Sequence, residues 1–171
     1  SPYAAALLKH LSAGGYSFAD VMTMVGEEVY LNTKARQLPW VNSSLRRVLS
    51  FGSPIENPDP DETALRDGRR QLLLTISGQP EATKSTVESI ASAQGVPLAA
   101  LYGMLKVLGV DTSGGSGDLE NQLEEGARQL KAIKQQDLGT ASSDPELARF
   151  TDLANRAQEE GAIDLALKYR E

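Results

Sequence analysis

The chain has 171 residues, of which 40% are hydrophobic and 5% aromatic, with a formal net charge of −6, one histidine and no cysteine. This length allows one or two domains with a packed core. The negative charge argues against a general nucleic-acid binder and against binding to anionic membranes, since both need a basic face. No apolar run is long enough to span a bilayer. Without cysteine the chain forms neither disulfides nor zinc–thiolate sites, which fits a reducing compartment, and we expect a cytoplasmic protein.

Two amphipathic helices are predicted at the start of the chain. Three leucines between positions 7 and 11 form an apolar stripe, which predicts a helix over Tyr3–Leu11 that ends at Gly14-Gly15. A second helix is predicted over Phe18–Thr33, where apolar residues recur at three- and four-residue steps. The single histidine, His10, has no Asp or Glu nearby at metal-ligand spacing. We therefore interpret it as a helix-face residue that lies either near the surface or beside the core.

A short strand is predicted after these helices. Pro39 prevents a helix from extending further and biases the residue before it toward an extended backbone. The apolar run Val48–Phe51, with two arginines before it and a glycine after it, is typical of a strand. We expect Val48, Leu49 and Phe51 to form the outer edge of a sheet and an interface with strands of another polypeptide.

A break in composition separates this part from the rest. Three prolines with Asp and Asn residues over Ser53–Asp61 predict a linker at 53–61. Beyond it the predicted helices are Glu62–Ile76, Ala82–Ala93, Pro97–Leu108, Leu119–Gln136, Pro145–Glu160 and Ala162–Glu171. We therefore predict a first domain over 1–52, a helical domain over 62–137 and a helical hairpin over 144–171.

Four features of residues 1–52 follow one another: two helices, Arg36-Gln37-Leu38-Pro39-Trp40, a Ser43-Ser44-Leu45 step and the closing run Val48–Phe51. This order resembles the C-terminal, small-subunit end of caspase and metacaspase cysteine peptidases, especially the bacterial caspase-like proteins. The resemblance implies an α/β fragment, namely two helices and the last strand of a caspase-like α/β/α sandwich, followed by an all-α region. It also implies peptide-bond hydrolysis, with the Cys/His dyad on an upstream fragment, because this chain lacks cysteine.

Under this resemblance the chain holds no catalytic residue, metal site or cofactor. Arg36 and Gln37 are candidates for contact with a peptide substrate, and the alternative is that they satisfy backbone groups of the loop. Trp40 is interpreted as a packing residue that seals the helix layer on the sheet. The implied partners are the upstream large peptidase fragment and a protein or peptide substrate.

The helical half allows further interpretations. Ser85–Gly109 could form a helix-turn-helix, but its second helix carries only Lys106 as a cation, so we expect no nucleic-acid partner. The hairpin over 144–171, with small residues around Gly161, is similar to the first unit of a tetratricopeptide array, and the alternative is a plain helical bundle. A regulatory protein could bind there.

Two main functions therefore remain open from the sequence, with a regulator that uses Ser85–Gly109 to bind DNA as a third and weaker one. The chain is either the C-terminal fragment of a caspase-like cysteine endopeptidase with a helical interaction region, or a non-catalytic helical protein–protein interaction module. Neither function involves a membrane.

Overall fold

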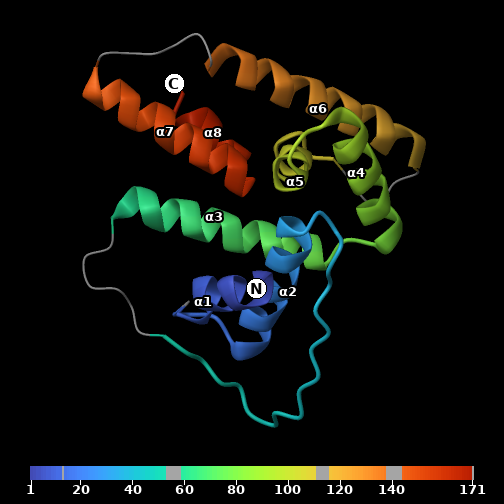
Figure 1. Ribbon diagram of the computed structural model, residues 1–171, viewed down its shortest axis with the longest axis vertical. Helices are drawn as coiled ribbons and strands as arrows, with labels where there is room; N and C mark the ends of the chain where they lie inside the picture. The colour runs from blue at the N-terminus through green and yellow to red at the C-terminus, as the bar shows by residue number, and fades with distance from the viewer. Residues whose placement is uncertain (13, 53–58, 111–115, 138–143, 171) are drawn as a thin grey trace. The chain divides into compact units, whose positions relative to one another are not determined.

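The computed structural model describes residues 1–12, 14–52, 59–110, 116–137 and 144–170 (Figure 1). Its helices are α1 (Pro2–Leu11), α2 (Phe18–Asn32), α3 (Pro60–Ser77), α4 (Glu81–Gln94), α5 (Leu98–Val107), α6 (Ser116–Asp137), α7 (Pro145–Glu160) and α8 (Ile163–Lys168). Each predicted helix is present, with ends within about three residues of those expected. No helix among the described residues is long and apolar enough to cross a bilayer.

The predicted last strand is wrong, and with it the α/β fragment. The only regular elements among the described residues are helices, and none of these residues forms a strand. Of the run Val48–Phe51, only Ser50 pairs, in one isolated antiparallel bridge to Ser17. A strand needs a neighbouring strand with which it can form several hydrogen bonds in succession. Ser17 is the N-cap of α2, and the residues after it form a helix, so the pairing cannot continue beyond it. The sheet-edge role expected for Val48, Leu49 and Phe51 is therefore not seen.

The chain divides into two compact units. Unit 1 comprises Ser1–Asp59 and Leu73–Gly78, and unit 2 comprises Pro60–Leu72 and Gln79–Glu171. Helix α3 thus contributes to both, because its last residues belong to unit 1 and the rest to unit 2.

Unit 1 is built on α1 and α2, which pack against each other (Figure 1). Both begin at serine caps: Ser1 Oγ accepts a hydrogen bond from the backbone N–H of Ala4 at 3.2 Å, and Ser17 forms a capping box with Asp20. Such a cap stabilises a helix start by about 1 kcal/mol. The apolar stripe of α2 supplies most of the core, whose buried side chains include Val21, Met24, Val25, Val29 and, from α3, Leu73 and Ile76.

Unit 2 centres on α5, which packs against α4, α6, α7 and α8. Its residues from Ala99 to Leu105 are all buried. The helix-turn-helix interpretation of Ser85–Gly109 would need an exposed face on this helix to contact bases. Because that stretch forms the interior of the unit, the structure gives DNA binding no support here.

Helices α7 and α8 occupy the segment predicted as a hairpin. Asp144 caps α7 by accepting a hydrogen bond from the backbone N–H of Glu146 at 3.0 Å, and Gly161 ends it in the left-handed region with φ of 81°. The two helices bury small side chains against α3, in a cluster of Leu65, Leu153, Ala157, Ala162 and Ala166. The relation of this hairpin to tetratricopeptide repeats stays a prediction.

Two glycines allow α5 to approach the turn between α7 and α8. A Cβ atom at Gly103 would collide with the carbonyl group of Gly161. A Cβ atom at Gly161 would in turn meet the carbonyl oxygen of Ala99 at 2.5 Å. Backbone atoms cannot move aside as a flexible side chain can, so this close packing depends on both glycines.

Charged side chains also join α3 to α7. Arg156 donates two hydrogen bonds to the carboxylate of Glu62, at 2.6 and 2.9 Å, and this contact raises the pKa of the arginine above its usual range. Arg69 is buried and donates to the carbonyl oxygen of Glu160 at 2.8 Å. Helix α3 is therefore joined to α7 by an exposed ion pair and by a hydrogen bond from a buried arginine.

The segments predicted as linkers are described only in part. Residues 53–58 of the linker at 53–61, and the glycine- and serine-rich stretches 111–115 and 138–143, lie outside the described residues. Pro60 begins α3, where a helix tolerates a residue without an N–H group. The domain boundaries drawn from the sequence stay predictions.

Candidate functional site

The most distinctive surface of unit 1 is an extended segment, residues 37–49, which we call the strap. At its start the backbone N–H of Gln37 donates to Oγ1 of Thr33, just after α2, at 3.0 Å. At its end the carbonyl oxygen of Leu49 accepts a hydrogen bond from the N–H of Phe18, in the first turn of α2, at 2.6 Å. The strap therefore runs back along α2 from its C-terminus to its N-terminus, and both of its ends are held by that helix.

The strap is longer than the distance it has to cover. Helix α2 has 15 residues, which span about 22 Å along its axis. Extended chain of the strap's length reaches about 40 Å. The excess length lets the middle of the strap bow away from the helix.

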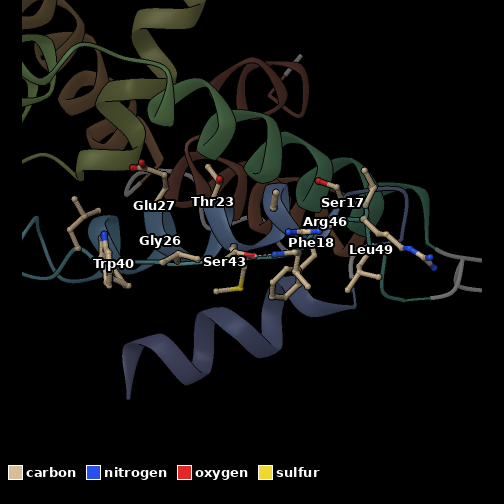
Figure 2. Close-up of a pocket in the computed structure, with 17 residues that line it drawn as sticks. Ser17, Phe18, Thr23, Gly26, Glu27, Trp40, Ser43, Arg46 and Leu49 are labelled. Atoms are coloured by element: carbon tan, nitrogen blue, oxygen red, sulfur yellow. Dashed lines mark hydrogen bonds between the residues drawn. The ribbon is translucent and has the colours of Figure 1, made fainter.

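A cavity of about 710 Å³ lies between the strap and α2 (Figure 2). Its helix wall is formed by Phe18, Met22, Thr23, Gly26 and Glu27, and its strap wall includes Leu38, Trp40, Leu45, Arg46 and Val48. Figure 2 shows Trp40 toward the Glu27 end of the helix and Leu49 toward the Ser17 end. A second cavity of about 500 Å³ lies where the strap meets Tyr3 and Phe51, and it shares Trp40 with the first.

The strap exposes large apolar side chains to solvent. The exposed fractions are 85% for Trp40, 83% for Val48, 65% for Leu38 and 52% for Leu45. The prediction that Trp40 seals a helix layer on a sheet is therefore wrong, because its side chain is exposed and the part of the chain that the structure describes contains no sheet. Several large apolar side chains exposed on one segment are typical of an interaction site.

Gly26 keeps the helix wall of the cavity open. It lies in the middle of α2, where glycine costs about 1 kcal/mol relative to alanine. A Cβ atom built on it would have no neighbour within 4 Å. The position is thus not required by tight packing, and the space above it belongs to the cavity. Sequence reasoning missed this residue, and the available signal was a glycine inside an apolar helical pattern.

Arg36 and Gln37, the predicted substrate-contacting residues, lie where the strap begins. Both are exposed. Arg36 donates its backbone N–H to the carbonyl oxygen of Thr33 at 3.2 Å, and Gln37 is held by the same threonine. Neither residue lines the two cavities. Their backbones position the strap, and contact of their side chains with a ligand stays a prediction.

His10 belongs to a buried polar cluster between α1 and α2. Its Nε2 lies 3.1 Å from Oε2 of Glu28, and both side chains are almost fully buried. Oε1 of Glu28 accepts hydrogen bonds from Lys9 at 3.4 Å and from Asn32 at 3.1 Å. Neither His10 nor Glu28 lines the two cavities, so the cluster joins two helices and does not face the strap.

Within the ranges that the structure describes, no group of three or more His, Asp or Glu side chains could hold a metal ion. The chain also has no cysteine, so it offers no thiolate nucleophile. What unit 1 offers is an apolar surface with a recess, which is suited to binding.

No protein-family model matches the chain, and no curated protein or solved structure is significantly similar to it. The resemblance of residues 1–52 to caspase-like peptidases therefore stays a prediction. Function has to be argued from the geometry of the strap and its cavity.

Proposed function

We propose that this chain is a helical protein–protein interaction module that holds a segment of another protein between the strap and α2. The observation that carries this proposal is the exposed apolar strap over an open cavity in unit 1. The hairpin of α7 and α8 would serve as a second surface, for a regulatory protein. The cytoplasm remains the expected compartment, since a reducing environment suits a chain without cysteine.

The cavity fits an apolar side chain of a partner. Its walls combine Phe18, Met22, Leu38 and Trp40, and Gly26 leaves room at the helix surface. Burying a leucine or phenylalanine side chain contributes about 1.5–3 kcal/mol. One such anchor, together with contacts to the exposed side chains of the strap, is enough for a specific but reversible complex.

A library of random peptides tests the proposal. We would select peptides that bind the intact chain and compare their binding to Gly26→Leu, in which a side chain fills the cavity from the helix wall. Leucine is a good helix former, so α2 should remain folded. We expect the selected peptides to lose at least tenfold in affinity with this variant.

Two matched variants complete the design. Gly26→Ala adds a single methyl group and should retain binding. Leu8→Ala removes an exposed apolar side chain of α1 outside the cavity and should also bind normally. Peptides that bind all three variants equally, or a library that yields no binder, would reject the strap as a binding site.

A second candidate function is the peptidase-associated role predicted from residues 1–52. In that role a separate polypeptide with the Cys/His dyad would cover the apolar side chains of the strap, and this chain would bind it without contributing a nucleophile. The uncovered apolar surface of Trp40 and Val48 is the observation that favours it. Labelling a purified complex with iodoacetamide separates the two functions, because only the peptidase role requires a reactive thiol on the partner.

A further inference from the structure

The strap and the residues just before it are the basic part of an acidic chain. Between Glu28 and Glu56 the sequence contains no Asp or Glu, yet it contains four cations, namely Lys34, Arg36, Arg46 and Arg47. The rest of the chain contains the remaining thirteen Lys and Arg residues and all 23 Asp and Glu residues. Although the whole chain has a net charge of −6, this segment carries only positive charges, so the electrostatic potential near it is expected to be positive.

The cations are exposed at both ends of the strap. Arg46 and Arg47 line the cavity, and Lys34 and Arg36 lie where the strap leaves α2. None of the four side chains forms an ion pair with any residue that the structure describes. They are therefore available to an anionic partner without breaking an existing contact.

The cavity itself places a limit on where that negative charge can lie. Glu27 is the one acidic residue among its lining side chains, and it is buried in the helix wall. A carboxylate placed against the helix wall of the cavity would lie beside the carboxyl group of Glu27 and apolar side chains, which offer it no hydrogen-bond donor. An apolar side chain would meet Phe18, Met22 and the space above Gly26 instead.

We infer that the partner segment held by the strap is acidic, with an apolar side chain in the cavity and carboxylates on either side of it that pair with Arg46 and Arg47. This inference rests on the proposed function and adds the chemistry of the partner to it. Arginine favours such pairing, because its planar guanidinium can hold a carboxylate through two hydrogen bonds. An anionic bilayer would also meet the basic and apolar side chains, but a flat surface cannot fill a recess between a strap and a helix.

Trp40 provides a direct measurement, because it is the only tryptophan of the chain and it lines both cavities. Three peptides share a central leucine pair and differ in their flanking residues, which are acidic, serine or basic. Each is titrated into the full chain while the emission of Trp40 is recorded. We expect a blue shift with the acidic peptide at concentrations at least tenfold below those needed for the serine peptide, and an advantage that shrinks as salt is added.

Two charge-reversal variants of equal net charge are the controls. Arg46→Glu/Arg47→Glu should weaken binding of the acidic peptide at least tenfold and strengthen binding of the basic one. Lys134→Glu/Lys168→Glu changes two exposed cations of unit 2 and should leave the preference intact. Gly26→Leu should abolish the response to every peptide.

The outcomes separate this inference from the proposed function. If the serine or basic peptide binds as tightly as the acidic peptide or more tightly, and Gly26→Leu still weakens this binding, the inference of an acidic partner is wrong and the proposed binding site stands. If none of the three peptides binds and the random library yields no binder, both the acidic partner and the proposed function would be overturned. A shift of Trp40 emission with phosphatidylserine vesicles but with no peptide would assign the surface to a membrane. A shift that grows with protein concentration alone would assign it to a second copy of the chain.

Discussion

Nε2 of His10 and Oε2 of Glu28 lie 3.1 Å apart in the interior of unit 1 and join α1 to α2. Glu28 is the centre of this cluster, since Lys9 and Asn32 also donate to it. Buried polar groups of this kind remain stable only while each retains its partners.

Replacing Glu28 with alanine should therefore destabilise unit 1 strongly. We expect the free energy of unfolding to fall by about 3–5 kcal/mol, because His10 loses its hydrogen-bond partner in the interior of unit 1. Urea denaturation measures the change. The double variant His10→Leu/Glu28→Leu should recover much of the loss, since apolar side chains of similar size need no partner. A loss below about 1 kcal/mol for Glu28→Ala would show that water reaches the pair.

Trp40 should behave as a solvated side chain when no partner is bound. Acrylamide should quench its emission efficiently, since 85% of the residue is exposed. Trp40→Ala should change the free energy of unfolding by no more than about 0.5 kcal/mol, as expected for a surface substitution, and should weaken partner binding at least tenfold. Trp40→Phe, which keeps an apolar ring, should retain part of the affinity. Strong protection from acrylamide would mean that the strap closes over the cavity by itself.

Gly26→Ala should stabilise the protein. The added methyl group meets no atom within 4 Å, and alanine favours a helix interior over glycine by about 1 kcal/mol. We expect a gain of about 0.5–1 kcal/mol in the free energy of unfolding, measured by urea denaturation. Destabilisation by this substitution would indicate that the strap lies closer to α2 in solution.

The same substitution at Gly103 should have the opposite sign. Its methyl group would collide with the carbonyl group of Gly161, so α5 would have to move away from the turn between α7 and α8. We expect Gly103→Ala to cost about 1–3 kcal/mol of stability even though alanine is the better helix former. The pair of variants is informative because helix propensity is identical and only the surroundings differ. A neutral result at Gly103 would mean that the close approach is not maintained.

Local patterns were sufficient to predict the helices. The capping serines Ser1 and Ser17, the proline at position 145 and the glycine at 161 act on neighbouring residues, and they mark helix ends close to where the structure has them. The predicted strand at Val48–Phe51 was wrong for the opposite reason. Strand formation depends on a partner elsewhere, and an apolar run carries no information about whether that partner exists.

The candidate site could be predicted only in part. Pro39 and the apolar run Val48–Phe51 indicate extended backbone, but the sequence prediction places Val48–Phe51 at the edge of a sheet. That the strap returns along α2 depends on two hydrogen bonds, one from the Gln37 N–H to Oγ1 of Thr33 and one from the Phe18 N–H to the carbonyl oxygen of Leu49, and the pattern of apolar side chains does not reveal either. The cavity depends in addition on Gly26, whose importance lies in the absence of a side chain.

Both ends of the strap are hydrogen-bonded to residues at the two ends of α2. The number of residues between these two attachment points can therefore vary with little change in the free energy of folding. Loop-closure entropy grows only logarithmically, by about 0.6 kcal/mol for each doubling of length. Removing residues between the two attachment points would draw the strap toward α2 and make the recess shallower, and adding residues would deepen it. A shorter strap also has less conformational entropy to lose when a ligand binds. Chain length alone, with no change at any contact residue, would therefore tune both the size of the accepted side chain and the lifetime of the complex.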